Sequence, residues 1–220
     1  MKSENSRSQN KKYRIGITGG IASGKTFATT YFKNRGFTVF FADQLAAEIM
    51  NNDPEIISSI VSEFGKDSYL DGRLNRAYLA AAVFGSPEKV QKLNAIVHPA
   101  VVKQSDLLLK KELERNDLVF YEAALIFEAG MTERFDYILL ITADVKVRVS
   151  RALARGGISE DEIRKRISSQ ISEEEKINRS HFVIINNGTQ EELREKLNNF
   201  LQFLLKGEAE KLHQFPHFFK

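Results

Sequence analysis

Residues 19–26 have the types and the spacing of a loop that binds phosphate. They read Gly-Gly-Ile-Ala-Ser-Gly-Lys-Thr and fit the pattern G-x-x-x-x-G-K-[ST] at every fixed position. Small residues let the backbone N–H groups of such a loop turn inward around phosphate oxygens, and the following helix points the positive end of its dipole at the same charge. We therefore predict a nucleotide-phosphate site built from Gly19, Gly20, Ile21, Ala22, Ser23, Gly24, Lys25 and Thr26.

Two side chains of this loop carry chemistry of their own. Lys25 can reach the β- and γ-phosphates of the nucleotide, and Thr26 can supply a hydroxyl to Mg²⁺. The loop indicates nucleotide binding without indicating the reaction. A GTPase would also carry N-K-x-D and D-x-x-G motifs, and neither occurs at a suitable strand end. A short chain with a helical insertion favours a kinase of a small metabolite.

Asp43 directly follows the second predicted strand. Ligands of a parallel sheet collect at the carboxyl ends of its strands, and we expect this strand to neighbour the one that carries the phosphate loop. A carboxylate there can accept the proton of an attacking hydroxyl, or orient that hydroxyl toward the γ-phosphorus. The alternative is that Asp43 only caps a helix over residues 44–50.

The strands that must position these residues are short, continuous apolar runs separated by helical stretches. This pattern is typical of a parallel sheet covered by helices on both faces, and so of the α/β class. A helix over residues 25–35 is expected to follow the phosphate loop. The predicted strands are residues 13–18, 37–41, 118–121, 137–141 and 182–185.

A long helical insertion separates the second and third strands. Proline is tolerated in the first helical turn and asparagine caps it, which predicts helix starts at Pro54, Asn75, Pro87 and Pro99. The segment exceeds what a crossover connection needs, so we expect a helical subdomain that covers a substrate. A last helix over residues 190–205 repeats leucine and phenylalanine at helical spacing and should pack on the sheet.

Charge and composition exclude several classes of protein. The 220 residues hold 32 Lys and Arg against 29 Asp and Glu, a net charge of +3, but residues 1–12 alone account for this excess. We interpret these residues as a disordered basic leader. The remainder is close to neutral, so no nucleic acid partner is expected.

Cysteine is absent, which excludes a disulfide scaffold and a cysteine nucleophile. No apolar run reaches the roughly 20 residues of a membrane span, and the first residues lack a secretory signal. We expect a cytoplasmic protein without a membrane partner, present as a monomer or a small homo-oligomer.

The motifs of the chain follow one another in an order that resembles the dephospho-CoA kinase family. The resemblance covers residues 13–205, and it begins with the phosphate loop and Asp43. Many families share the loop, whereas the ordered set is specific to this one. The later motifs are Leu74-Asn75-Arg76, Asn94-Ala95-Ile96-Val97-His98-Pro99, Leu125-Ile126-Phe127-Glu128, Arg151, Arg155, Gln170 and Ile184-Ile185-Asn186-Asn187-Gly188.

The resemblance implies an activity and a fold. The activity is phosphorylation of the ribose 3′-hydroxyl of dephospho-CoA by ATP, which gives CoA and ADP and uses Mg²⁺. The fold is a three-layer P-loop kinase domain over residues 13–205 with a five-stranded parallel sheet. Its parts are a core of residues 13–43 and 117–205, a CoA-binding helical insertion at about 44–116, a lid at about 150–178, and a C-terminal tail of residues 206–220.

Roles for single residues also follow from the resemblance. The implied catalytic residues are Asp43, Lys25 and Arg155. The implied substrate-binding residues are Asp43, Arg76 and His98. Thr26 is the implied Mg²⁺ ligand. Besides the phosphate loop, the ATP-binding residues are Phe27, Arg151, Asn187 and Gly188.

The residues themselves leave plainer interpretations open. Arg151 and Arg155 could form a solvated basic helix face, and His98 could cap a helix. Asn187 with Gly188 could serve only a turn. Arg76 could pair with Glu48 or Glu63, and Arg166, Gln170 and Lys176 are weaker candidates in the lid.

Several positions depart from the pattern of the family. Ala22 replaces a glycine, which is conservative if its φ is negative, and Ala47 stands where an arginine is common. The loss of that arginine bears on substrate contact. The other departures are Phe41, Ala124 and His181.

Two further functions stay open. A nucleoside or nucleotide kinase would share the core and the lid, and a nucleotide-binding partner module would have lost catalysis. The presence of both Lys25 and Asp43 argues against the second.

Overall fold

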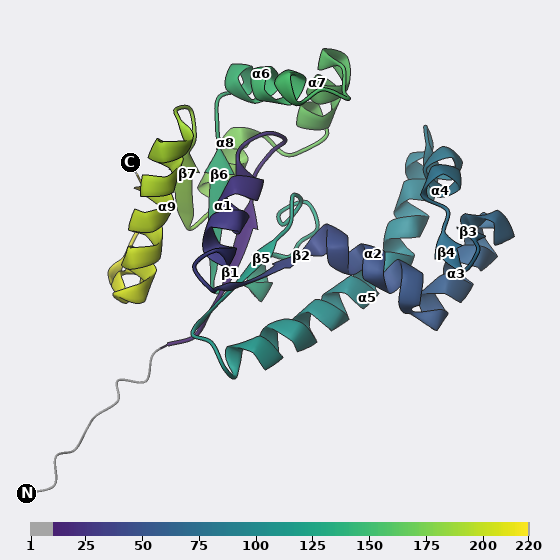
Figure 1. The fold of residues 1–220 in the computed structure, drawn as a ribbon, viewed down its shortest axis with the longest axis horizontal. Coiled ribbons are helices and arrows are strands. Elements are labelled where there is room, and N and C mark those ends of the chain that lie inside the picture. Colours follow the sequence, from purple (N-terminus) through teal and green to yellow (C-terminus); the bar gives the residue numbers. More distant parts are fainter. Residues whose placement is uncertain (1–10, 220) are drawn as a thin grey trace, which may run out of the picture. The chain divides into compact units, whose positions relative to one another are not determined.

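The computed structural model describes residues 11–219, so the leader predicted over residues 1–12 lies almost wholly outside the described residues. The chain divides into two compact units. One contains the chain up to Val39 and from Glu112 onward, and the other runs from Phe40 to Lys111 (Figure 1). Within residues 11–219, no helix is both long enough and apolar enough to cross a membrane.

The first unit is built on a six-stranded sheet with the order β2-β5-β1-β6-β7-β8. The pairs from β5 through β1, β6 and β7 to β8 are all parallel. The α/β class and the parallel sheet are therefore confirmed. The strands are β1 Tyr13–Thr18, β2 Thr38–Phe41, β5 Leu118–Glu122, β6 Tyr137–Thr142, β7 Phe182–Ile185 and β8 His217–Phe219.

Two details of the predicted sheet are wrong. β5 lies between β2 and β1, so the strand before Asp43 does not neighbour the strand of the phosphate loop. Strands that are consecutive in sequence need a crossover connection to run parallel, and that connection can leave room for a later strand. The sheet also has six strands rather than five, because the tail supplies β8.

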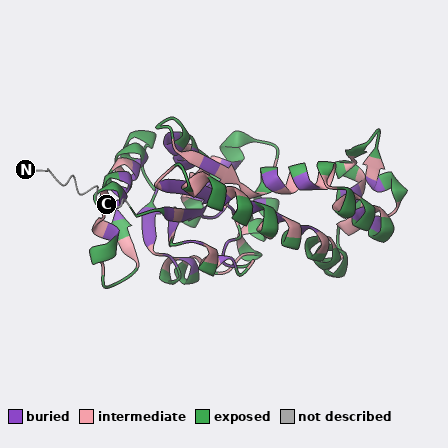
Figure 2. Ribbon diagram, turned by 90° about the horizontal axis from the view of Figure 1, so that it is seen from below, coloured by how far each residue is buried: buried purple, intermediate pink, exposed green. Residues whose placement is uncertain are grey.

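Alternating side chains of β5 hold helices and loops on opposite faces of the sheet, because successive residues of a strand point to opposite sides. Phe120 stacks on Phe32 of α1 (Lys25–Lys33), with ring centroids 4.2 Å apart. Tyr121 contacts Phe135 at 5.6 Å. The central strands β1, β5, β6 and β7 are accordingly mostly buried, as the purple ribbon in Figure 2 shows.

The remaining helices of this unit come after strands β5, β6 and β7 in the chain. The predicted helix over residues 190–205 is confirmed as α9, Gln190–Leu205. It covers the same face as α1, since Phe200 contacts both Phe32 and Phe182. The others are α6 Val145–Arg155, α7 Glu160–Ser168, α8 Glu173–Asn178 and the 3₁₀ helices η2 Thr132–Arg134 and η3 Glu208–Lys211.

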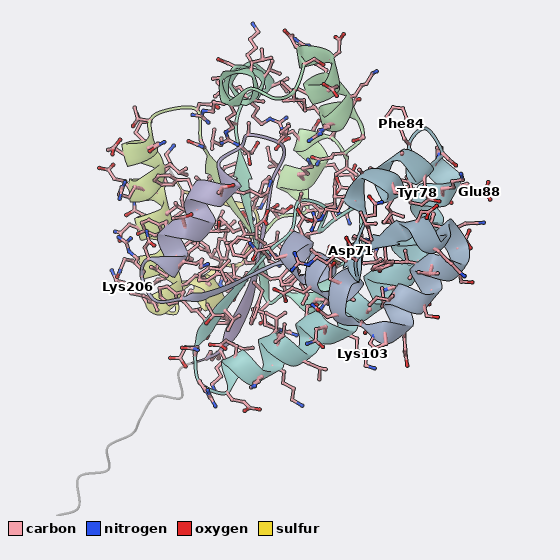
Figure 3. The ribbon with its side chains drawn as sticks, turned by 45° about the vertical axis from the view of Figure 1, so that its right-hand side comes forward. Asp71, Tyr78, Phe84, Glu88, Lys103 and Lys206 are labelled. Carbon is pink, nitrogen blue, oxygen red and sulfur yellow. The ribbon has the colours of Figure 1, made fainter. Side chains whose placement is uncertain are left out.

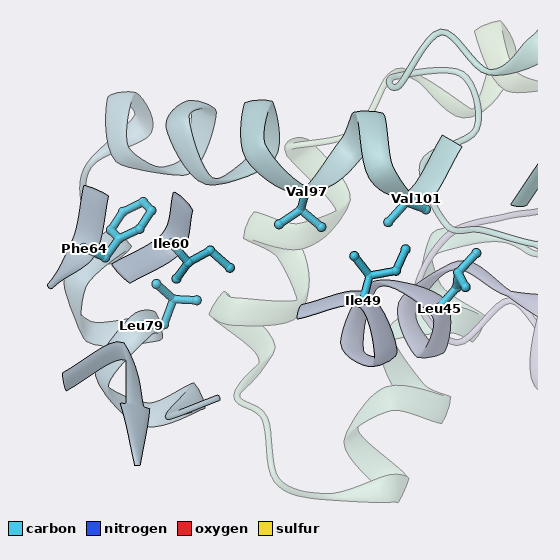
Figure 4. Close-up of a cluster of buried hydrophobic side chains, with 7 residues drawn as sticks. All are labelled: Leu45, Ile49, Ile60, Phe64, Leu79, Val97 and Val101. Carbon is cyan, nitrogen blue, oxygen red and sulfur yellow. The ribbon is translucent and has the colours of Figure 1, made fainter. Parts of the chain in front are cut away.

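The second unit packs its helices around a core of its own. Seven buried side chains from four helices meet there (Figure 4). Asp53 and Asn75 cap their helices through their side chains, as their positions predict. The elements are α2 Ala42–Asn52, α3 Pro54–Phe64, η1 Lys66–Ser68, the hairpin of β3 Tyr69–Leu70 and β4 Arg73–Leu74, α4 Arg76–Val83 and α5 Pro87–Leu113.

The helix start predicted at Pro99 is wrong, because α5 continues through this residue. Proline removes one backbone hydrogen bond from the helix. The same face nevertheless carries buried residues on both sides of the proline, namely Val97 before it and Val101, Ser105 and Leu109 after it. Burial of this continuous face offsets the missing bond.

The turn at Asp71 connects β3 to β4 (Figure 3). Asp71 has a φ of +49°, which aspartate tolerates better than most residues. Nearby, the Tyr78 hydroxyl donates to the carbonyl of Phe64 at 2.9 Å. Phe84, which ends α4, is 89% exposed.

The tail docks on the edge of the sheet through aromatic side chains. The His217 ring stacks on Phe203 with centroids 5.0 Å apart, and the His217 N–H donates to the carbonyl of His181. The Phe219 side chain is buried, whereas Phe215 and Phe218 remain partly exposed. The tail is therefore part of the folded unit.

His181 holds this edge together in its neutral form. Its Nδ1 accepts a hydrogen bond from the Ile138 N–H at 3.1 Å, and its ring contacts Phe215. Burial lowers the pKa of His181, and the Glu133 carboxylate opposes part of this shift. A protonated ring could not accept the bond from Ile138.

We expect the free energy of unfolding to decrease as the pH falls, because the folded protein holds His181 in its neutral form. The unfolded chain binds a proton there near the ordinary pKa of 6.5, whereas the folded chain resists it. The contribution is therefore complete above about pH 6.5 and is lost as the pH falls toward the lower folded pKa, by at most about 1.4 kcal/mol per pH unit.

Urea unfolding between about pH 8 and about pH 5 tests this expectation. His181→Asn keeps an acceptor for Ile138 and should lose less stability than the wild type over this range. His213→Asn, at an exposed position, is the control and should follow the wild type. A His181→Asn profile parallel to that of the wild type would contradict the assignment.

Candidate active site

The phosphate loop lies between β1 and α1, as its physics requires. The helix begins at Lys25, whose Nζ donates to the carbonyls of Gly19 and Gly20 at 2.6 and 3.3 Å. Ser23 Oγ is buried and has no hydrogen-bond partner among the described residues. A buried hydroxyl without a partner is costly, and a phosphate oxygen would satisfy it. The loop therefore fits the ligand that its sequence predicts.

Ala22 does not meet the condition under which its replacement of glycine would be conservative. Its φ is +56°, in the left-handed region that disfavours residues with a side chain. Its methyl group is buried in a cluster with Val149 and Ala152 of α6 and Ile163 of α7. Burial of the methyl group partly offsets the backbone strain, and it packs the loop against both helices.

Asn186, directly after β7, connects the phosphate loop to the rest of the unit. Its Nδ2 donates to the Ser23 carbonyl at 2.8 Å, and its backbone N–H donates to Thr142 at 2.7 Å. The side chain is buried. Asn186 belongs to a motif of the sequence that indicates no role for it; its position at the carboxyl end of a strand is the signal that could have found it.

Arg151 is not a solvated member of a basic helix face. Its guanidinium donates to the carbonyls of Asn186 and Gly188, at 2.7 and 2.8 Å. The adjacent Asn187 side chain accepts from the Asp144 N–H at 2.8 Å. These bonds fix the loop after β7 against α6.

A pocket of about 270 Å³ opens beside these residues. It brings together four of the residues predicted to bind ATP, which are Ala22, Gly24, Phe27 and Arg151, and the exposed Arg155. Its lining combines apolar and polar side chains, as the linings of small-molecule sites do. The other lining residues are Ala154, Asn186, Thr189, Gln190 and Leu193.

A buried charged cluster lies at the base of the predicted lid. Arg148 pairs with Glu173 at 3.2 Å, and Lys176 donates to the Gln170 side chain at 2.6 Å. Thr142 donates to Glu173 at 2.5 Å. Burial lowers the pKa of Lys176, and the Glu173 and Glu128 carboxylates oppose the shift. Sequence reasoning missed Arg148 because an arginine on a polar helix is expected to face solvent.

The three residues predicted to bind the acceptor belong to the Phe40–Lys111 unit. Asp43 is exposed in the first turn of α2, where Phe41 and not Asp43 occupies the N-cap, so the capping interpretation of Asp43 is wrong. His98 is exposed in the interior of α5, so it caps no helix start. Arg76 is exposed and begins α4, while Glu63 pairs with Lys92 at 2.8 Å.

The donor set suits Mg²⁺ bound chiefly by phosphates and water. Thr26 exposes its side chain in the first turn of α1. Residues 11–219 contain no group of three or more His, Asp or Glu side chains placed to hold a metal ion. Mg²⁺ normally keeps several waters and takes one or two protein oxygens beside substrate phosphates, which this loop can provide.

Comparison with known proteins gives consistent matches. A family model described as dephospho-CoA kinase matches residues 13–192. The dephospho-CoA kinase of Chlorobaculum tepidum is 38% identical over 197 residues, which cover 87% of this chain and 94% of the relative. That of Salinibacter ruber is 38% identical over 184 residues, covering 83% and 92%.

Solved structures agree with the sequence matches. A protein from Thermus thermophilus superposes with a TM-score of 0.74 at 35% identity, covering 90% of this chain and 98% of that protein. A dephospho-CoA kinase from Campylobacter jejuni gives a TM-score of 0.71 at 25% identity, with coverages of 89% and 98%.

Two asparagines test the architecture of this site. We expect Asn186→Ala to raise KM for ATP about tenfold, because the lost bond leaves the Ser23 carbonyl of the phosphate loop without its partner. Asn199→Ala, at an exposed position of α9, is the matched variant and should change KM less than about threefold. Steady-state kinetics with varied ATP measure both, and equal effects would refute the distinction.

Proposed function

This chain belongs to the dephospho-CoA kinase family and phosphorylates dephospho-CoA with ATP in coenzyme A biosynthesis, and we propose the residues by which it does so. The reaction transfers a phosphoryl group to an alcohol, the ribose 3′-hydroxyl, and gives CoA and ADP. The observation that carries the assignment of residues is the complete phosphate loop between β1 and α1, with Lys25 at its end and the pocket of about 270 Å³ beside it.

Asp43 is the proposed catalytic base. Its carboxylate takes the proton of the 3′-hydroxyl while the new O–P bond forms, and the bond between the γ-phosphorus and the bridging oxygen breaks to release ADP. Its place after β2 supports this role, since ligands gather beyond the carboxyl ends of parallel strands. Its exposure leaves the carboxylate accessible to an acceptor.

Cationic side chains are proposed to stabilise the charge that develops on the phosphates. Lys25 reaches from the start of α1 to the β- and γ-phosphates, and Arg155 lies at the pocket from the end of α6. Arg151, held by two carbonyls, lines the nucleoside part of the pocket with Phe27. Asn187 and Gly188 lie in the loop after β7, between the lining residues Asn186 and Thr189, and are proposed to contact the nucleotide.

Mg²⁺ is the proposed companion of ATP. When bound, it neutralises charge on the β- and γ-phosphates. The Thr26 hydroxyl would hold it, together with phosphate oxygens and water.

The Phe40–Lys111 unit is the proposed acceptor-binding subdomain, with Arg76 and His98 as contacts for dephospho-CoA. A lid over about residues 150–178 would cover the phosphates. The glycines at 156 and 157, with φ of +72° and +79°, supply a hinge between α6 and α7. We further propose a cytoplasmic monomer or small homo-oligomer with no nucleic acid partner.

A nucleoside or nucleotide kinase is the alternative enzyme with the same core. ADP release is compared with dephospho-CoA, nucleosides and nucleoside monophosphates as acceptors. We expect turnover with dephospho-CoA to exceed the others, and a preference for a nucleoside monophosphate would overturn the assignment. ATP binding without any turnover would indicate a silent partner module.

Removal of the proposed base should slow chemistry more than binding. We expect Asp43→Asn to lower kcat by about 10²- to 10⁴-fold, because the amide cannot accept the proton. Lys25→Ala should also abolish most activity. A coupled assay of ADP release with Mg·ATP and dephospho-CoA measures both rates.

Asp67→Asn is the matched control for Asp43→Asn, since Asp67 is also exposed in the Phe40–Lys111 unit. It should keep kcat near that of the wild type. Calorimetric titration with dephospho-CoA should give similar affinities for Asp43→Asn and the wild type. A near wild-type kcat for Asp43→Asn would remove its role.

A further inference from the structure

Arg148 of α6 is a buried cation that contacts the phosphate loop. Its side chain is 2% exposed, although arginine is among the residues least often buried completely. Its Nε has no hydrogen-bond partner among the described residues. The proposed reaction assigns Arg148 no role, and burial of such a group calls for a reason.

Gly20 shows how close the guanidinium lies to the loop. A Cβ added at Gly20 would lie 1.9 Å from Arg148 Nη1 and 3.1 Å from Cζ. The third neighbour, Gln170 Oε1, lies at 3.7 Å, an ordinary contact. The φ of Gly20 lies outside the left-handed region. A methyl group at position 20 is therefore opposed by the Arg148 side chain and not by the backbone.

The guanidinium is held in this place by partners outside the loop. Arg148 Nη2 lies 3.2 Å from the Glu173 carboxylate, which also accepts the Thr142 hydroxyl. These partners come from α8 and from the end of β6. This ion pair joins a buried arginine to a half-buried carboxylate that accepts a further hydrogen bond, and it restricts the orientation of the arginine.

We propose that Arg148 is a positioning residue for ATP. Its guanidinium packs against Gly20 and holds the phosphate loop in its binding conformation. This inference rests on the proposed function of the loop. It assigns to Arg148 a role in nucleotide affinity, through the backbone of the loop and through a fixed positive charge behind the phosphates. A purely structural ion pair between α6 and α8 would instead affect stability alone.

A double-mutant cycle between Gly20 and Arg148 separates these roles. Arg148→Met keeps most of the apolar stem and removes the guanidinium that occupies the space beside Gly20. We expect Arg148→Met to raise KM for ATP about tenfold while kcat changes less than about threefold. Gly20→Ala in the wild type should lower kcat/KM for ATP about 100-fold, because the methyl group displaces the guanidinium or the loop.

The informative quantity is the factor by which Gly20→Ala lowers kcat/KM for ATP in the Arg148→Met background. We expect this factor to fall below about threefold, since the guanidinium that the methyl group would meet is then absent. An unchanged 100-fold cost would overturn the proposal. A wild-type KM for ATP in Arg148→Met would overturn it as well.

Gly24→Ala is the matched control within the same loop. Its Cβ would meet Asn186 Nδ2 at 2.4 Å, and its φ is +111°, so its cost should be the same with and without Arg148. Rescue of Gly24→Ala by Arg148→Met would indicate general loosening of the loop and would contradict a specific role of the contact between Arg148 and Gly20.

Folding and nucleotide affinity are measured separately from turnover. Arg148→Met leaves Glu173 without its cation, so Arg148→Met with Glu173→Gln is prepared as a second background. Thermal melts establish which variants fold, and failure of both backgrounds to fold would assign Arg148 to stability and overturn the proposal. Titration with ADP should show the same rescue as the kinetics. If turnover with dephospho-CoA is lost but Gly20 and Arg148 remain coupled in ADP binding, the result counts against the proposed function and not against the positioning role of Arg148.

Discussion

A loop that binds phosphate through its backbone N–H groups must offer those groups to the ligand, and so it cannot use all of them to hold its own shape. Its conformation has to be held by side chains. Within the loop, Lys25 Nζ donates to two of its carbonyls, and from the end of β7 the Asn186 side chain donates to a third. The rest of the nucleotide-binding unit is arranged around this requirement.

Helix α6 contributes three kinds of contact to that arrangement. Val149 and Ala152 pack on the side chain of Ala22, and Arg151 fixes the loop after β7. Arg148 lies against Gly20. One short helix therefore contacts the phosphate loop, the pocket beside it and, through Glu173, the start of α8, so a change in its position would alter all three. In the proposed function, this is a physical route by which movement of the proposed lid and occupancy of the loop depend on each other.

Much of this site could be predicted from local sequence patterns. The phosphate loop, five strands of the sheet and the helix α9 follow from glycine spacing and hydrophobic periodicity, which act over a few residues. Pro99 shows the limit of such patterns. Proline is a good signal for a helix start, but the buried face of α5 on either side of it outweighs one lost hydrogen bond. That face is decided by contacts with α2, α3 and α4, which no window of sequence around Pro99 contains.

The sequence by itself determined the class of fold, the family and the residues of the phosphate loop, because their chemistry is fixed by residue type and short spacing. Only the tertiary structure decided that β5 separates β2 from β1, that the tail adds β8, and that Asn186 supports the loop. It alone decided that Arg148 is buried. The physical reason is the same in each case. These features depend on partners far away in the chain, such as Glu173 for Arg148, and a charged residue is read as exposed until its partner is known.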